Sequence, residues 1–142
     1  MSRDGIDISE LDDLTKQLMN LAARKMPRET KKFMREQGTK LKRNTVKKAR
    51  QKVKKRTGNY IKGIKRGKVY KYKGDETSIR VYNSMPHSHL IEQGHRIVGK
   101  DGSEHGFQRG AFVFKEAGEQ FSDEFARNCE QFTYDLLQKG LK

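Results

Sequence analysis

The amino-acid sequence predicts an α+β fold in which N-terminal helices and a C-terminal helix pack on a small antiparallel sheet of three to four strands. Three observations favour this class. Apolar residues recur every three or four positions near both ends of the chain. Large apolar and polar residues alternate between residues 68 and 83. Helices and strands do not alternate along the chain, and no internal repeat occurs, which argues against a parallel βαβ sheet.

The length of 142 residues is that of one domain, and we expect one domain over residues 1–142. Its first part, residues 1–55, should be helical, and basic from residue 24 onward. Residues 56–114 should form the sheet and include a loop at 99–110. Residues 115–140 should form the C-terminal helix.

Two helices are predicted in the N-terminal part, with a break or kink where Met26 meets Pro27, since a residue before proline disfavours helix. Asp7 and Glu10 resemble a helix-capping pair at the start of the first helix. Its apolar row comprises Ile8, Leu11, Leu14, Leu18, Leu21 and Ala22. The second helix, from Arg28 to about Lys54, has a thinner row, so most of it should face water or a partner; this row comprises Met34, Gly38, Leu41, Thr45, Ala49 and Val53.

Two strands are expected after the glycine-containing segment "RTGNYIKGIK" (56–65) ends the second helix. "KVYKYK" (68–73) and "TSIRVYN" (77–83) alternate, and "GDE" between them is typical of a hairpin turn. Tyr70 and Tyr72 would share one strand face, with Ile79 and Val81 as candidate partners.

The remaining elements are a loop, a short strand and a long helix. "GKDGSEHGFQRG" (99–110) has four glycines and no periodicity, which indicates a flexible surface loop. "AFVF" (111–114) predicts a short strand. The last helix should begin near Lys115 and stop at Gly140, with an apolar face of Ala117, Phe121, Phe125, Cys129, Phe132 and Leu136.

Charge is segregated along the chain. The formal net charge is +14, and residues 24–73 hold 22 of the 32 Lys and Arg residues but only two acids. Such a region attracts nucleic acid or an acidic protein surface, although it can also be a solvated helix face. The candidate interface residues in the basic helix are Lys42, Lys47, Lys48 and Lys54.

Membrane insertion and disulfide bonding are not expected. No run of 18 uncharged apolar residues occurs, and the acidic N-terminus has no apolar signal-peptide stretch, so we expect a soluble chain with no membrane partner that is not exported by that route. The single cysteine, Cys129, excludes an internal disulfide and fits a small core residue.

The histidine-rich stretch "SMPHSHLIEQGHRIVG" (84–99) raises the question of a metal or catalytic site. Zinc could use His87, His89, Glu92, His95 and His105, but their spacing matches no known signature. We therefore predict no metal, no cofactor and no catalytic residue. A small toxin-type ribonuclease with a histidine base stays open, and it would need a convergent pocket.

Nucleic-acid binding without enzymatic activity is a further alternative. Tyr60, Tyr70 and Tyr72 lie among lysines, as the aromatic residues of a stacking platform would. Tyrosine is equally ordinary in an exposed strand.

Three short motifs, in this order, resemble the neck or minor tail-component proteins of long-tailed bacteriophages and phage-like elements. They read "RTGNYIKGI" (56–64), "HLIEQGHRI" (89–97) and "GAFVFKEA" (110–117), and the similarity covers roughly residues 30–140. The second has the form hydrophobic-Glu-x-Gly. The chain departs from that pattern at Leu90 and Ile91, where an aromatic residue is common, and at His95, where threonine is common.

The resemblance implies a non-enzymatic virion protein that forms a ring at the head-to-tail junction and is assembled in the host cytoplasm. Its partners would be further copies of itself, adjacent head-closure and tail proteins, and possibly DNA in the channel. Thr57, Gly58, Glu92 and Gly94 would then be scaffold residues. Gly94 would permit a backbone conformation that other residues resist, and Glu92 would cap backbone donors or pair with a basic neighbour.

Overall fold

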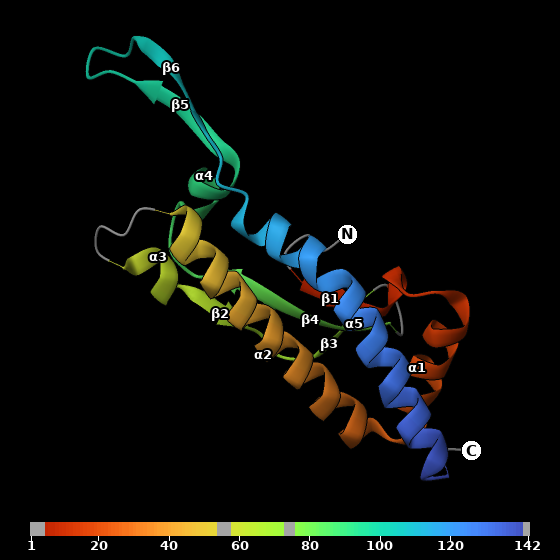
Figure 1. The fold of residues 1–142 in the computed structure, drawn as a ribbon. Helices are drawn as coiled ribbons and strands as arrows, with labels where there is room; N and C mark the ends of the chain where they lie inside the picture. Colours follow the sequence, from red (N-terminus) through yellow and green to blue (C-terminus); the bar gives the residue numbers. More distant parts are fainter. Residues whose placement is uncertain (1–4, 54–57, 73–75, 141–142) are drawn as a thin grey trace.

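A layer of helices lies on one face of an antiparallel sheet (Figure 1). The computed structural model describes residues 5–53, 58–72 and 76–140. The helices are α1 (Asp13–Lys25), α2 (Pro27–Lys52), α3 (Asn59–Lys62), α4 (Ser88–Gln93) and α5 (Val113–Gln138), with a 3-10 helix η1 (Ile8–Glu10). The strands are β1 (Gly5–Asp7), β2 (Ile64–Arg66), β3 (Tyr70–Tyr72), β4 (Glu76–Asn83), β5 (Gly94–Val98) and β6 (Glu104–Arg109). The α+β class, with a C-terminal helix on a four-stranded sheet, is confirmed.

Strand β4 organises the sheet because β1, β2 and β3 all pair with it in antiparallel register. The predicted pairing of the two alternating segments is confirmed, while residues 74 and 75 of the "GDE" turn lie outside the described residues. The expected side-chain partners were wrong. Tyr70 lies opposite Ser78, whereas Ile79 lies opposite Ile6 and Val81 opposite Arg66.

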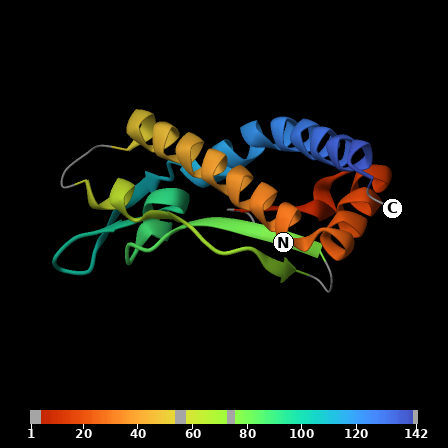
Figure 2. The same ribbon diagram turned by 90° about the horizontal axis from the view of Figure 1, so that it is seen from below.

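The core lies between the sheet and the helices, which cover one face of the sheet and leave the other uncovered (Figure 2). Ile79 and Val81 of β4 are fully buried in the same cluster as Met34 of α2 and Phe121 of α5. Helix α2 approaches β4 closely at Gly38, where a Cβ atom would lie 2.8 Å from Cδ1 of Ile79. The thin row predicted for this helix is therefore its contact with the core; its described members are buried, apart from the half-buried Val53.

The start of the first helix differs from the prediction. Asp7 caps η1 by accepting a hydrogen bond from the Ser9 amide, and α1 begins later, where Asp12 accepts from the amide of Thr15 at 2.8 Å. No continuous helix runs from residue 8 to align Leu14 with the buried Ile8 and Leu11, and Leu14 is 67% exposed. The buried residues of α1 are Thr15, Met19 and Ala22. The break at Met26 is confirmed. Pro27 occupies the first turn of α2, where an N–H group would have no partner within the helix, so proline loses no hydrogen bond there.

Two predictions for residues 99–114 were wrong. Residues 104–109 form strand β6, which pairs with β5, so the segment is mostly a hairpin and not a loop. The pairing register shifts between Arg96 and Val98. All residues of β6 are exposed and only Phe107 is large and apolar, so the segment has no alternation that would have indicated a strand. The "AFVF" segment is not a strand, because Phe112 caps α5 and Val113 and Phe114 form its first turn.

The rest of α5 follows the prediction. Ala117, Phe121, Phe125, Cys129 and Leu136 are buried, and Phe132 is partly buried. Gly140, with φ of 89°, follows the helix as its C-terminal stop. Burial raises the pKa of the Cys129 thiol, with the charge of Glu130 as a smaller cause, as expected for a core cysteine.

Candidate functional site

The three sequence motifs meet in space at the N-terminus of α5. The Glu92 carboxylate accepts hydrogen bonds from the backbone amides of Phe114 at 3.0 Å and Lys115 at 3.1 Å. Phe112, the N-cap residue, has a φ of 52° and makes no side-chain cap of its own. Of the two roles expected for Glu92, capping backbone donors is the one the structure shows. The carboxylate also lies at the positive end of the helix dipole, which favours it there.

Gly94 adjoins this cap and starts a projecting hairpin. Its φ is 89°, and a Cβ atom would lie only 2.4 Å from the carbonyl oxygen of Gln108. The Ile91 and Glu92 carbonyls accept hydrogen bonds from the Ala111 and Phe112 amides at 2.8 and 3.0 Å. These contacts join the two ends of the hairpin, so its root is fixed to the body.

The first motif packs beside the cap through Tyr60. Gly58, with φ of 78°, precedes α3, and the side-chain amide of Asn83 donates to the Tyr60 carbonyl at 2.9 Å. Burial raises the pKa of Tyr60, and the charge of Glu92 adds to this effect. Thr57, the other predicted scaffold residue of this motif, lies outside the described residues.

The β5–β6 hairpin extends away from the body (Figure 1). Every residue from 95 to 109 is exposed except the half-buried Gly99. Three apolar side chains are among them: Ile97 is 41% exposed, Val98 58% and Phe107 62%. Large apolar side chains on an isolated projection are unusual unless they contact another molecule.

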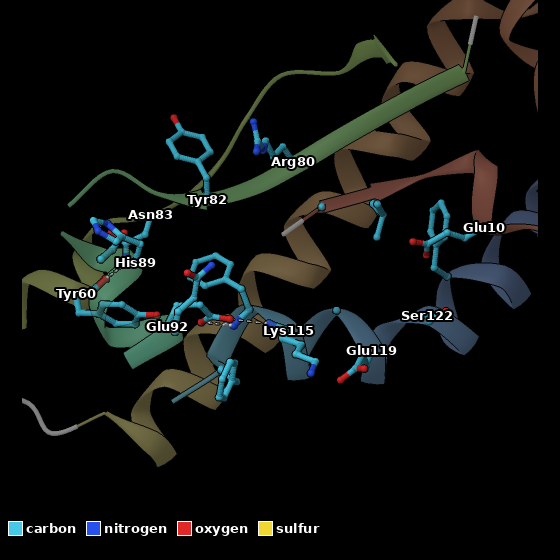
Figure 3. Close-up of a pocket in the computed structure, with 18 residues that line it drawn as sticks. Glu10, Tyr60, Arg80, Tyr82, Asn83, His89, Glu92, Lys115, Glu119 and Ser122 are labelled. Carbon is cyan, nitrogen blue, oxygen red and sulfur yellow. Dashed lines mark hydrogen bonds between the residues drawn. The ribbon is translucent and has the colours of Figure 1, made fainter. Parts of the chain in front are cut away.

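An open groove of about 1020 Å³ lies beside the hairpin root, between α4, α5, β4 and the N-terminal segment (Figure 3). It mixes charges of both signs, because Glu10, Glu92 and Glu119 line it together with Arg80 and Lys115. Burial, with Asp7 as a smaller cause, raises the pKa of Glu10. The mixed lining suits no single class of charged ligand.

Of the lysines predicted to form a basic interface, only some are exposed in the structure. Lys47 is exposed, whereas Lys42 is half-buried and Lys48 is half-buried with its Nζ 3.8 Å from Glu116. Lys54 lies outside the described residues. The side of α2 opposite its buried residues carries a larger basic set, interrupted by the exposed acids Glu29 and Glu36. We call this basic set the basic row: Arg28, Lys32, Arg35, Arg43, Lys47 and Arg50.

Sequence reasoning missed most of the basic row, although the signal was available. Its members stand three, four or eight positions apart, which is one face of a helix, and all are exposed. Together they span about 33 Å of helix length. Placing the buried row first and then taking the opposite face would have found them.

The histidines do not gather into a site. His87 and His89 flank the start of α4 with ring centroids 6.2 Å apart, and His105 in the hairpin lies 3.0 Å from the Ser103 hydroxyl. Over residues 5–53, 58–72 and 76–140, no group of three or more potential metal-ligating side chains converges.

A tyrosine platform does not form as the alternative supposed, because Tyr60 is buried beside α5. Tyr70 is half-buried, and the side chain of Tyr72 is outside the described part of the chain.

Comparison with known families identifies the chain. A family model described as "Bacteriophage HK97-gp10, putative tail-component" matches residues 12–94, which is more than half of the sequence. The chain belongs to this family. It is therefore a structural, tail-related component of a phage particle, in agreement with the resemblance of its motifs.

The match ends at Gly94, where the hairpin begins, so β5, β6 and α5 lie beyond it. Comparisons with curated proteins and with solved structures gave no significant match. Among the described residues, no helix combines the length and the apolar character needed to cross a membrane.

Proposed function

We propose that this tail component forms a ring in the neck of the particle, at the junction of head and tail. There it would complete the tail and contact copies of itself and the adjacent head-closure and tail proteins. We propose that the chain has no catalytic role and uses no cofactor. Family membership supports the structural role. The proposal of a ring rests on the projecting β5–β6 hairpin.

The hairpin has a rigid root and an uncovered arm. Its root is held by the Ile91 to Ala111 and Glu92 to Phe112 backbone bonds, whereas Val98 and Phe107 on the arm are more than half exposed. A two-stranded hairpin in water is marginally stable by itself. Burial of these side chains against another chain would both stabilise the arm and join two subunits.

A projecting arm that contacts a different surface on its neighbour makes a head-to-tail interface. Such interfaces are heterologous, and they generate a ring when the rotation between subunits closes. This geometry supports a ring in preference to a two-fold dimer.

Replacing both Val98 and Phe107 with serine tests the proposal in a phage or phage-like element that carries the variant chain. Because both side chains are exposed, the stability of the subunit should change by only about 0.5 kcal/mol per site. Electron micrographs should show unjoined heads and tails. The control is Lys100→Ser in the turn of the same hairpin. Joined particles in normal numbers with the double variant would contradict the proposal.

A second candidate function, nucleic-acid binding, is favoured by the basic row on α2. In a ring, this row could also face DNA in the channel. Binding through it would weaken steeply with added salt, because each phosphate contact releases counterions. Titration of duplex DNA with the purified chain at several salt concentrations measures this directly.

A further inference from the structure

The outer face of the helix layer carries opposite charges on two neighbouring helices. Helix α2 has eleven basic and two acidic residues, and α5 has six acidic and two basic ones. The two helices lie antiparallel. Lys52 and Lys48 reach Glu116 at one end of the pair, and the Phe33 and Phe132 rings stack 4.2 Å apart at the other.

Several acidic residues of α5 are also exposed, and Glu119 among them borders the groove of Figure 3. The exposed side of this helix, opposite its buried aromatic residues, contains what we call the acidic row: Glu119, Asp123 and Glu130, each exposed. Arg127 is the one basic residue on that side of α5. Two apolar residues continue the row toward the C-terminus, since Tyr134 is 57% exposed and Leu137 is 45% exposed.

The two rows lie on neighbouring helices. Helix α2 meets α5 through Phe33, Gln37 and Lys52, and no member of either row takes part in these contacts. Figures 1 and 2 show α2 and α5 covering the same face of the sheet. The basic row spans about 33 Å of helix and the acidic row about 16 Å, so each copy carries a longer positive stripe and a shorter negative one.

This pattern discriminates between partners. A nucleic-acid duplex placed on the basic row would also bring phosphates toward the exposed Glu29 and Glu36 of α2, and like charges at close range oppose binding. A second copy of this chain can place its acidic row over the basic row, with opposite charges facing each other. Its own basic row is then left for a third copy, as in a head-to-tail contact.

We propose that the outer face of the α2–α5 layer is a contact surface between copies of this chain, with the basic row of one copy against the acidic row of the next. This contact rests on the proposed self-assembly but involves a different surface from the hairpin. Tyr134 and Leu137 supply apolar area at the end of the contact. Because both rows are exposed, added salt screens the attraction and weakens assembly.

Two charge-reversal variants test the contact. One carries Arg43→Glu and Lys47→Glu on the basic row, and the other carries Glu119→Lys and Asp123→Lys on the acidic row. All four side chains are exposed, and none takes part in the ion pairs between α2 and Glu116. Sedimentation velocity at about 0.05 M salt measures assembly, and circular dichroism checks the fold.

Each variant alone should self-associate about tenfold or more weakly than the wild type, because like charges then face each other. Mixing the two variants in equal amounts should restore assembly, since each variant now complements the other. A chain carrying all four substitutions should also assemble by itself. A matched control, Lys65→Glu and Lys68→Glu, has exposed side chains in and beside β2, away from both rows and from the hairpin, and should assemble normally.

Three results would overturn the proposal: a monomeric wild type at this salt concentration, normal assembly of either variant alone, or no restoration on mixing. If the first variant loses affinity for duplex DNA and the mixture does not assemble, the basic row is a nucleic-acid site instead. If the charge variants assemble normally and the Val98→Ser, Phe107→Ser variant does not, the proposed ring stands and only this contact is wrong.

Discussion

Helices α2 and α5 have the same length of 26 residues and pack side by side on one sheet, yet they are held there by different interactions. The buried side of α5 includes Phe121, Phe125 and Leu136. The buried side of α2 includes Thr30, Gln37 and Thr45 alongside its few apolar residues.

The two helices are therefore held in different ways: α5 by burial of large apolar side chains, and α2 by close approach of its backbone to the sheet. Large apolar side chains let α5 gain stability through the area that they remove from water. Helix α2 instead lies close to β4 at Gly38, and its polar contacts connect it to α5, with Gln37 accepting a hydrogen bond from Asn128 at 2.8 Å. Its outward side is then free to carry charge, and we infer that assembly uses that side.

Substitution of one buried side chain in each helix should give the largest contrast between the two helices. Phe121→Ala in α5 should lower the free energy of unfolding by about 3–5 kcal/mol, because it leaves a cavity at a site that is 1% exposed. Thr45→Val in α2 removes a hydroxyl bonded to the Leu41 carbonyl but keeps the shape, so the change should be within about 1 kcal/mol.

Urea unfolding of both variants measures this difference. Equal losses in the two variants would show that α2 and α5 contribute to the core in the same way.

The starts of the two helices offer the next contrast. Helix α5 begins with amides held by Glu92, whereas α2 begins at Pro27 without a side-chain cap. Glu92→Ala should therefore lower the free energy of unfolding by about 1–2 kcal/mol. Glu92→Gln keeps one accepting oxygen and should lose less.

Amide hydrogen exchange should locate the Glu92→Ala effect at Phe114 and Lys115. Unchanged protection of those two amides would mean that the cap contributes nothing to the helix.

A smaller effect at neutral pH is expected at Tyr60, which packs beside the start of α5. Its buried hydroxyl has no hydrogen-bond partner within the described residues, so Tyr60→Phe should change stability by no more than about 1 kcal/mol at pH 7. Because the pKa of Tyr60 is raised in the fold, the unfolded chain loses this proton first as the pH rises above about 10. Stability of the wild type is then lost with increasing pH.

Unfolding curves measured on either side of pH 10 should therefore show a steeper loss for the wild type than for Tyr60→Phe. Parallel losses would mean that Tyr60 titrates normally in the fold.

The outward charges should have the smallest effect on the fold. Reversing Arg43 and Lys47 to glutamate should change the free energy of unfolding by about 0.5 kcal/mol or less per site, because both side chains are exposed. Thermal unfolding of the variant against the wild type measures it. A loss of several kcal/mol would show that the basic row supports the fold of α2 and is not reserved for a partner.

The sequence predicted α5 and the β3–β4 pair well because each has a strong local pattern. Phe121, Phe125 and Cys129 recur at helical spacing, and Tyr70 and Tyr72 alternate with lysine. Strand β1 escaped prediction since three residues are too few to show alternation, and only pairing with β4 makes Gly5–Asp7 a strand.

The candidate site was predictable in its residues but not in its geometry. Glu92 and Gly94 were identified from a short motif, and a possible cap was foreseen. Which helix Glu92 caps depends on Phe114 and Lys115, more than 20 positions away, so no local pattern could show it. The hairpin was taken for a loop because both of its faces meet solvent, so β6 shows no alternation.

Self-assembly through surfaces that the subunit leaves uncovered is tested most directly by the mass of the purified wild-type chain. Sedimentation equilibrium at about 0.05 M and about 1 M salt compares strong and weak screening of the charged rows. We predict one defined oligomer larger than a dimer at low salt, visible as closed rings by electron microscopy, that dissociates at high salt. A monomer of 16.5 kDa under both conditions would contradict self-assembly.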